Sequence, residues 1–514
     1  MRVGWNFEAE MSEKSELEMT GRPSFLLRRC SILVVFWCST ISLGISMVGF
    51  SSCATVFANE YAVSQEEKTG GPQPVHSGKG QPGPDAHGFL SLDQAIEEAL
   101  RASPELSQIQ QRISAAMEQV KQATAAFYPR IVLSEEYNAT DNPVFALMNI
   151  INQRRLKTSV NFNQPGQQQN YSSRIQGELS LFEGGSRWYD RRAALDIHDS
   201  VRSELLAARN FLVSKVTEIY YQWLQALDFI GVAEETLEAA KTDVRLAEAR
   251  RRAEVALRSE VMRLKAREAE VQGELVSARA GARRLQAGLE RLLARSIRPE
   301  EIPKEIQTTP FTLSEDIDKK PDVLVTRALD SRPELAAVRS LIQAARKRVR
   351  SAEGGLWPKL DTRASYQWDS ENLSEGEDSW IFAIRFSWPI FEGGLTLSKI
   401  REARIRLKEL ESRGEQVALD VALEVNQASL ALQEAVEKIK VAEERRIYAQ
   451  EALEEVRQQY RHQVATVDSL LQTEVAWNRA KVAYTSALFE GKIAEALLRQ
   501  SLGEFANWME AHNE

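Results

Sequence analysis

The sequence predicts a mainly α-helical chain with a small β part, arranged as two copies of a helix–β-hairpin–helix unit. Three observations support this prediction. Short motifs from the first half of the chain recur in the second half at nearly constant spacing. Proline is absent from 166–298 and from 390–514, which leaves room for very long helices. Four shorter segments alternate between apolar and polar residues, as half-exposed strands do.

The composition limits the possible functions. The chain has 514 residues, of which 43% are hydrophobic and 27% charged, so it can form a folded core. Its net charge of −8 argues against a nucleic-acid partner, because such partners require a basic face. The only long apolar run lies before residue 60, so no membrane-spanning helix is predicted for the mature chain. All three cysteines also lie there, the last at Cys53, and no cofactor is predicted.

Residues 1–58 are predicted to be an export signal. Arg28-Arg29 precedes an apolar run over 31–50, and small residues follow near Ala58, as secretory signals require. The run is longer than in most signals, so a membrane anchor is the alternative. Acidic residues before Met19 are unusual in a signal, which makes Met19 an alternative start of translation.

Two kinds of processing remain open. Cleavage after Ala58 fits the small residues there, whereas Phe50-Ser51-Ser52-Cys53 resembles a lipoprotein box in which Cys53 would be acylated. Residues 59–89 are rich in Gly, Pro, Ser and Gln, which predicts a flexible linker. A GxGxxG pattern at 78–83 has no strand before it, so it does not indicate a dinucleotide site.

The repeat is visible in two motifs. Pro104-Glu105-Leu106 recurs as Pro333-Glu334-Leu335, at an offset of 229, and Phe182-Glu183-Gly184-Gly185 recurs as Phe391-Glu392-Gly393-Gly394, at an offset of 209. The difference indicates an insertion of 20 residues in the first copy. It lies within Asn138–Asn170, which is rich in Asn and Gln and is predicted to form the tip of a hairpin.

The motifs divide the mature chain into predicted parts. The first repeat covers 90–296, with strands at about 130–140 and 171–182 and long helices over 186–296. The second covers 322–505, with strands at about 359–369 and 380–390 and long helices over 395–503. A linker at 297–321 joins them, and 506–514 is a tail.

The long helices carry coiled-coil seams. Apolar residues from Leu257 to Leu292 step by threes and fours, and Leu212, Val216 and Trp223 begin a similar seam in the preceding helix. The returning helix (260–296) and the first helix of the second copy (334–356) together nearly match the 186–254 helix in length. These lengths predict that the two shorter helices stack end to end beside the long one.

The alternating segments suit strands between lipid and water. The candidates for lipid-facing side chains are Leu179, Tyr366, Trp368, Phe382, Ile384 and Phe386. A soluble hairpin with one buried face gives the same alternation, so both interpretations remain open. If the strands do cross a membrane, four are too few for a closed barrel, and several chains must share one.

Together these features resemble the TolC family of outer-membrane efflux proteins over about Leu90 to Phe505. The resemblance implies a homotrimer in the bacterial outer membrane, with a shared transmembrane β-barrel and a periplasmic α-barrel of long coiled-coil helices. It further implies a periplasmic adaptor, an inner-membrane pump of unknown class, surrounding outer-membrane lipid, and transport without catalysis. The alternative function is a soluble periplasmic coiled-coil adaptor or structural protein.

The same resemblance points to a periplasmic aperture at the helical turns. Val464–Leu470 is similar to the family's turn, which places Asp468 at the narrowing, with Ser259 at the equivalent position of the first copy and Glu260 beside it. An aspartate here is equally typical of a helix N-cap. The sequence departs from the family at His462, Val464 and Leu471, which leaves open whether an Arg–Asp latch closes the entrance.

Other residues near the turns are candidates for contacts with an adaptor, namely Val464, Ala465, Val255 and Ala256. Seven arginines between Arg245 and Arg267 either bind an adaptor or form a solvated helix face. An enzyme is not predicted, because the five histidines are scattered and no nucleophile turn or phosphate loop occurs.

Overall fold

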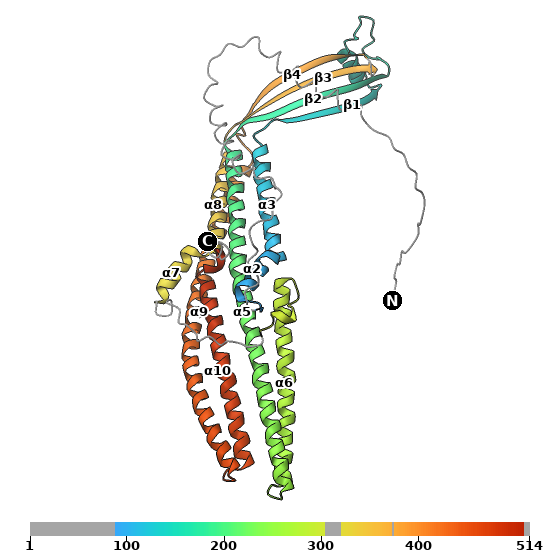
Figure 1. Cartoon of the computed structure of the whole chain (residues 1–514). Coiled ribbons are helices and arrows are strands. Elements are labelled where there is room, and N and C mark those ends of the chain that lie inside the picture. The colour runs from blue at the N-terminus through green and yellow to red at the C-terminus, as the bar shows by residue number, and fades with distance from the viewer. Residues whose placement is uncertain (1–87, 304–319, 373–374, 508–514) are drawn as a thin grey trace, which may run out of the picture. The chain divides into compact units, whose positions relative to one another are not determined.

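The computed structural model of the chain describes residues 88–303, 320–372 and 375–507, all of which fall within the unit Ala86–Glu514. The predicted export signal, including Met19, Cys53 and Ala58, lies outside the described residues. So do nearly all of the 59–89 linker, residues 304–319 of the linker between the repeats, and residues 508–514 of the tail. The predicted fold class is confirmed, since the described residues form long helices and one small antiparallel sheet (Figure 1).

The order of the elements repeats once. The first copy contains α2 (Leu92–Ala102), α3 (Pro104–Ala125), β1 (Arg130–Thr140), α4 (Pro143–Asn152), β2 (Gln168–Glu183), α5 (Ser186–Arg252), α6 (Arg258–Leu293) and the 3-10 turn η1 (Pro299–Glu301). The second contains α7 (Pro321–Ser331), α8 (Pro333–Gly354), β3 (Lys359–Asn372), β4 (Glu375–Ser387), α9 (Leu395–Arg461), α10 (Val467–Ser501) and η3 (Glu504–Asn507). Among the elements that the structure describes, α4, within the insertion, is the one without a counterpart.

The two repeated motifs fix the ends of helices. Pro104 and Pro333 occupy the first turn of α3 and α8, where a missing N–H leaves no hydrogen bond unmade. The paired glycines precede α5 and α9 with positive φ, 63° and 81° at Gly184 and Gly185. A Cβ at Gly184 would lie 2.1 Å from the carbonyl oxygen of Gly354, so the two copies approach here through bare backbone.

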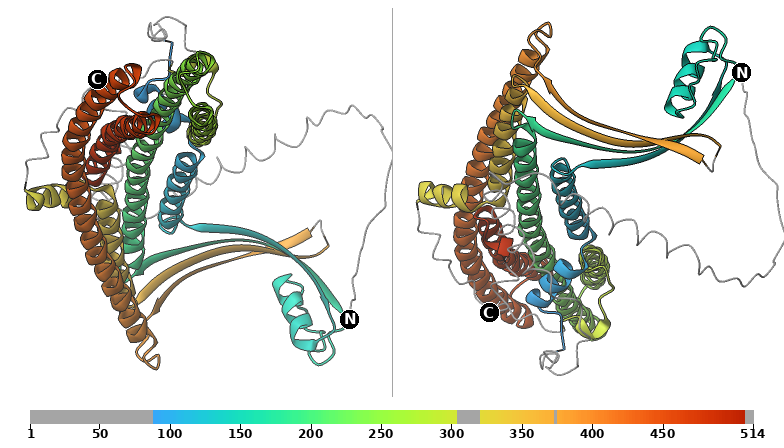
Figure 2. Two further views of the ribbon diagram at one scale, coloured as in Figure 1. Left: turned by 90° about the horizontal axis from the view of Figure 1, so that it is seen from below. Right: turned by 90° about the horizontal axis from the view of Figure 1, so that it is seen from above.

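The shorter helices stack within their own copy. Seen from the side and from the ends, α3 and α6 lie along one side of α5, while α8 and α10 lie between α5 and α9 (Figures 1 and 2). The apolar cluster at the joint in the first copy unites Ile96 of α2 and Leu106 of α3 with Leu289 of α6. The prediction that the returning helix of the first copy stacks on the first helix of the second was therefore wrong. The lengths of the helices alone do not show which helix ends pack together in one apolar cluster.

The predicted seams are buried or half-buried except at Leu257, which lies in the turn before α6 and is exposed. Leu212, Val216 and Trp223 of α5 are buried, as are Val261 and Leu264 at the start of the seam in α6. None of the helices that the structure describes is long and apolar enough to cross a membrane.

The sheet has strand order β1-β2-β3-β4, and every neighbouring pair is antiparallel. Its register aligns Leu133 of β1, Ile175 of β2, Tyr366 of β3 and Trp380 of β4 in one row across the sheet. Side chains alternate between the two faces of a strand, so residues an even number of positions from this row share its face. All six candidates for lipid-facing residues meet that condition, with no bulge between them and the row. The opposite face is polar, and there Arg363 forms an ion pair with Glu178 at 2.8 Å.

The bounds of the strands differ from the prediction by up to five residues. β4 begins at Glu375 rather than near 380 and ends at Ser387, before Pro389, which has no N–H to donate. The insertion also differs, because it contains α4. Asn142 caps this helix by accepting a hydrogen bond from the Val144 N–H at 3.1 Å, and Pro143 follows. An Asn-Pro pair before an apolar stretch is the signal that sequence analysis missed.

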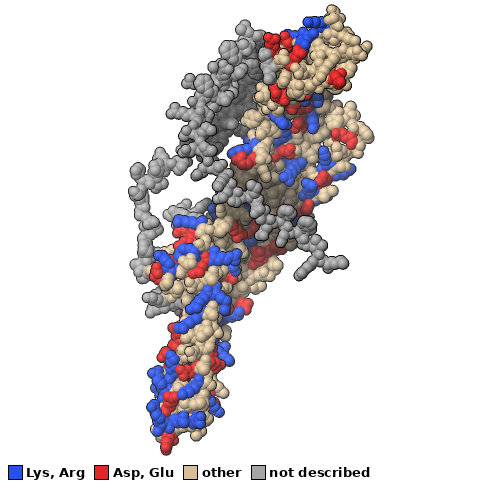
Figure 3. Space-filling model, turned by 90° about the vertical axis from the view of Figure 1, so that its right-hand side faces the viewer, with Lys and Arg blue, Asp and Glu red and all other residues tan. Residues whose placement is uncertain are grey.

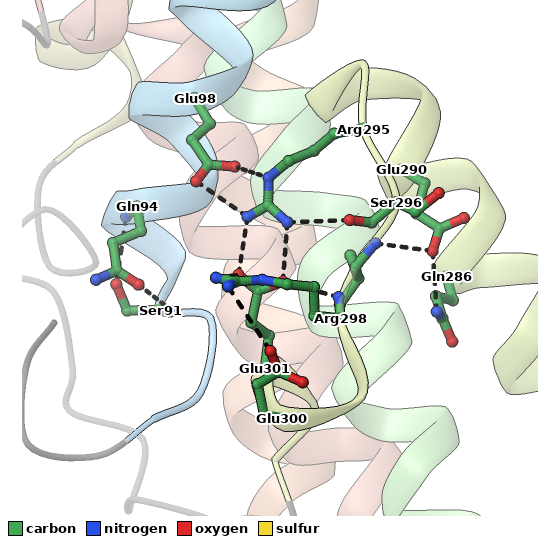
Figure 4. Close-up of polar contacts among 11 residues, drawn as sticks. Ser91, Gln94, Glu98, Gln286, Glu290, Arg295, Ser296, Arg298, Glu300 and Glu301 are labelled. Carbon is green, nitrogen blue, oxygen red and sulfur yellow. Dashed lines mark hydrogen bonds and ion pairs between the residues drawn. The ribbon is translucent and has the colours of Figure 1, made fainter.

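A polar cluster ties the end of α6 to α2 and η1 (Figure 4). Arg295 donates to Glu98 at 2.8 and 3.0 Å and to Glu301 at 2.8 and 3.2 Å. Burial alone would raise the pKa of Glu301, but hydrogen bonds from Arg298 and Arg295 lower it to about 2. The start of the predicted 297–321 linker is thus anchored to the first copy.

Candidate functional site

The site lies where the two long helical hairpins turn. α5 and α6 are joined by residues 253–257, and α9 and α10 by residues 462–466. Both turns hold one residue in the left-handed conformation, Glu254 at φ 58° and Gln463 at φ 64°. The Val255 N–H donates to the Arg250 carbonyl and the Val464 N–H to the Gln459 carbonyl, the closure typical of a helix C-terminus. Because a positive φ favours glycine, the position in this turn at which glycine is expected is Gln463 rather than His462.

An apolar cluster holds the two turns together. Val244 and Ala247 of α5 pack with Val261 of α6, and this group meets Leu453 of α9 and Leu470 of α10. Burial of these side chains supplies a non-directional attraction between the hairpins. The polar contacts around the cluster then decide their relative position.

One ion pair joins the hairpins at the tip. Nη1 of Arg263 on α6 lies 2.6 and 2.5 Å from the two carboxylate oxygens of Asp468 on α10. Asp468 is not the N-cap, because the Thr466 side chain caps α10 by accepting from the Ser469 N–H at 3.2 Å. That alternative interpretation of Asp468 was wrong. The chain thus contains an Arg–Asp ion pair at this turn, with its arginine supplied by the first copy.

A tyrosine makes the second link. The Tyr460 hydroxyl on α9 donates to Glu260 on α6 at 3.2 Å. Burial, followed by the nearby Glu260 carboxylate, raises the pKa of Tyr460 to about 12, so this donor stays protonated at neutral pH. Arg250 of α5 lies over the Tyr460 ring at 4.7 Å and also donates to the Tyr460 and Arg461 carbonyls at 3.3 Å.

A pair of carboxyl groups meets between the hairpins farther from the tip. The carboxyl group of Asp243 on α5 lies near that of Glu474 on α10, and Glu474 accepts a hydrogen bond from Arg457 of α9 at 3.1 Å. Burial, then the charge of Glu474, raises the pKa of Asp243 to about 7. The neighbouring contacts between α5 and α10 do not bring two acidic groups together. Glu235 pairs with the basic Lys481, and the neutral Thr236 bonds to Asn478. The carboxyl pair therefore makes the contact between hairpins sensitive to pH.

We expect the hairpins to associate more strongly as the pH falls. The pKa of Asp243 is raised in the associated arrangement, so that arrangement binds more protons between about pH 4 and 7. When the pH is lowered from 7.5 to 5.5, the population of associated hairpins relative to separated hairpins should rise by at most roughly 25-fold. Spin labels on cysteines at Val255 and Val464 would report the distance between the turns. Asp243→Asn should remove the dependence on pH, whereas the matched variant Glu235→Gln should keep it.

Charged side chains dominate this end of the molecule. Figure 3 shows Lys, Arg, Asp and Glu mixed densely over the helical hairpins, while other residues cover most of the strand region. A cleft of about 730 Å³ between the hairpins is lined by Arg263, Arg267, Arg445 and Arg479 but by only two acidic residues, Glu270 and Asp468. The Asp468 carboxylate is therefore compensated by Arg263 within the same chain.

The structure places the predicted residues as follows. Asp468 and Glu260 both bridge the hairpins, through Arg263 and Tyr460, while Ser259 is exposed beside them. Among the proposed adaptor contacts, Val255 and Val464 are exposed and Ala256 and Ala465 half-buried. Sequence analysis missed Asp243, Tyr460, Glu474 and the role of Arg263, since partners from separate repeats have no fixed spacing.

Comparison with known proteins agrees with this architecture. Residues 95–295 and 324–504 match the family of outer membrane efflux proteins. CyaE of Bordetella pertussis is 26% identical over 355 residues, which cover 67% of this chain and 70% of that protein. The multidrug resistance outer membrane protein MdtP of Escherichia coli is 23% identical over 245 residues, 45% of this chain and 48% of MdtP, so that match spans about half of its length.

Solved structures share the fold at low sequence identity. The outer membrane protein VceC of Vibrio cholerae has a TM-score of 0.67 and 19% identity, over 80% of this chain and 96% of VceC. The outer membrane channel CmeC of Campylobacter jejuni has a TM-score of 0.69 and 15% identity, over 80% and 85% of the two chains. The chain thus shares the fold of these two outer-membrane proteins. The chain belongs to the outer membrane efflux protein family and is located in the outer membrane, so the alternative of a soluble adaptor loses its support.

Proposed function

We propose that this chain forms the passive outer-membrane duct of a tripartite efflux or type I secretion system. In this role, a homotrimer carries substrates from a periplasmic adaptor and an inner-membrane pump to the cell exterior. The observation that carries the proposal is an open four-stranded sheet, apolar on one face and polar on the other, joined directly to helices of 67 residues. At 1.5 Å per residue such helices are about 100 Å long, a length suited to the periplasm.

The sheet requires other copies of the chain. Within the described residues, β1 and β4 each have one edge without a partner strand, and lipid does not tolerate open edges. Two copies would give eight strands, whose interior is just wide enough for side chains to fill. Three copies give twelve strands and leave space for a passage. The trimer is therefore the smallest closed assembly that conducts.

An apolar stripe on α9 supplies the surface for the neighbouring copy. Exposed side chains on this helix recur at intervals that keep them on one side, namely Ile405, Leu419, Leu423, Leu430, Val441 and Tyr448. A long exposed stripe with this period is typical of a helix that packs against another helix. Because α9 continues from the edge strand β4, the same neighbour would cover both.

The hairpin turns form the periplasmic entrance in this proposal. Three symmetric sets of the Arg263–Asp468 and Tyr460–Glu260 links would hold the hairpins together at the narrow end. An adaptor that binds the exposed Val255 and Val464, with Ala256 and Ala465 beside them, would then separate them. The multidrug resistance named for MdtP supports small-molecule drugs as one class of cargo.

We expect the detergent-extracted protein to be a trimer. The full chain has a mass of 57.9 kDa, and after loss of the export signal three copies sharing one barrel should give about 150 kDa plus detergent. Mass photometry or native mass spectrometry measures this directly. A stable monomer would contradict the shared barrel, and extraction without detergent would contradict its position in the membrane.

The loop between β1 and β2 is expected to face the exterior of the cell. It lies at the end of the sheet opposite the helices, close to Gln168 (Figure 1). An epitope inserted after Asn163 should be labelled by antibody on intact cells. The control is an epitope inserted after Val464, which should be labelled only after the outer membrane is permeabilised. The reverse pattern would mean that the orientation is inverted.

A further inference from the structure

A small pocket lies where the second copy passes from strands to helices. Its volume is about 380 Å³, and it lies between the end of α8 and the start of α9. The lining residues are Glu353, Leu356, Trp357, Leu397, Ile400, Arg401 and Arg404. The pocket thus combines apolar walls with a cluster of charges at one place.

The charges do not balance. Glu353 accepts hydrogen bonds from Arg404 at 2.9 Å and from Arg350 at 3.1 Å, so its carboxylate is already engaged. Arg401 instead donates to the neutral Ser398 hydroxyl at 3.1 Å, and no carboxylate of the described residues lies within 4.0 Å of it. One guanidinium therefore remains available to an anion that enters the pocket.

The first copy shows what is special about Arg401. At the equivalent positions, Arg192 lies over the Trp188 ring, with its guanidinium carbon 3.8 Å from the ring centroid. In the second copy the tryptophan is replaced by Leu397, which offers no aromatic face. The pocket thus pairs an unstacked arginine with an aliphatic wall.

The surroundings of the pocket are apolar and exposed. Large side chains with at least 47% exposure gather at this junction, namely Leu356, Trp357, Trp388, Ile390, Phe391, Leu395 and Leu397. Trp388, two residues after Phe386, donates its indole N–H to the Leu356 carbonyl at 3.1 Å. This bond ties the wall of the pocket to the strand that carries the apolar face. Tryptophan at the end of an apolar band is typical of the boundary between lipid and water.

We propose that this pocket binds a glycerophospholipid of the periplasmic leaflet, with its phosphate on Arg401 and an acyl chain along Leu356, Trp357 and Leu397. The proposal rests on the proposed function, because it requires the apolar face of the sheet to contact lipid. The excess of positive charge favours a headgroup with net negative charge over a zwitterionic one. The ligand is a membrane lipid rather than free phosphate, because most of the lining is apolar.

The test uses the full mature protein in vesicles of phosphatidylethanolamine and phosphatidylglycerol at a ratio of 3:1. A photo-crosslinking amino acid is placed at Leu397 or, as a reference, at Phe382, and the attached molecules are identified by mass spectrometry. At Leu397 we expect the ratio of phosphatidylglycerol to phosphatidylethanolamine among the attached lipids to be about five times the bulk ratio. Arg401→Gln should return the ratio to the bulk value, whereas the matched variant Arg192→Gln should leave the enrichment intact.

The outcomes separate the two proposals. Lipid attached at Phe382 but not at Leu397, or a crosslink from Leu397 to a second copy of the chain, would overturn the pocket and leave the duct intact. Enrichment that survives Arg401→Gln, or that disappears when inorganic phosphate is added, would also overturn it. No lipid at Phe382 would mean that the sheet does not face lipid, and both proposals would fail.

Discussion

Replacing Phe382 with arginine is expected to abolish assembly of the outer-membrane trimer. Phe382 lies near the middle of β4 on the apolar face, opposite Ala364, and 62% of it is exposed. A charged residue on the lipid face near the bilayer midplane costs about 2–4 kcal/mol. Each trimer would carry three such residues, so the cost is about 6–12 kcal/mol per barrel. Native electrophoresis of outer-membrane fractions measures the amount of trimer that survives.

The matched control places the same residue on the other face. Ser365 of β3 lies opposite Ile381, next to Phe382 in depth, and shares the polar face with Gln176. Ser365→Arg should therefore assemble at the level of the unaltered protein. Equal loss in both variants would mean that both faces are buried, and equal tolerance would mean that neither face contacts lipid.

Reversing the charge of Asp468 is expected to open the periplasmic entrance. An Arg–Asp pair as exposed as this one, with 58% and 60% of the side chains accessible, contributes about 0.2–1 kcal/mol. Asp468→Arg adds repulsion from Arg263 to that loss. In a trimer the free-energy change per chain is multiplied by three. We expect single-channel recordings to show an open fraction raised by one to two orders of magnitude.

A charge swap distinguishes the latch from a general loss of structure. Arg263→Asp alone should open the entrance, while Arg263→Asp combined with Asp468→Arg restores the pair in reverse order and should close it again. Arg258→Asp changes an exposed residue one turn away, for which no ion pair occurs within the described residues, and should leave the open fraction unchanged. Failure of the swapped pair to close the channel would mean that other contacts, such as Tyr460 with Glu260, hold the tip.

Much of the fold could be predicted because its signals are local. Pro104 and Pro333 mark helix starts that depend on one residue and its own turn. The paired glycines at 184–185 and 393–394 mark a backbone conformation that side chains disfavour. The alternation in β4 places Phe382, Ile384 and Phe386 on one face whatever the rest of the chain does.

The candidate site was less predictable, because its contacts cross between repeats. The sequence alone indicated Asp468 and Glu260, but their partners Arg263 and Tyr460 come from other helices. Arg263 and Asp468 are 205 positions apart, and no sequence pattern signals their contact. Arg263 in particular looked like one of several arginines on a solvated helix face.

The sequence by itself therefore determined most of the elements, their duplication and the two faces of the sheet, since each depends on neighbours along the chain. The tertiary structure alone decided which helix ends meet and which charges pair. Shared apolar clusters join α6 to α2 and α3, and α10 to α7 and α8, although helix lengths also allow other partners. Packing then brings Asp243 against Glu474, where burial makes a carboxyl group sensitive to neutral pH. Such properties arise from distances between residues that are far apart in the chain, which no local sequence pattern reveals.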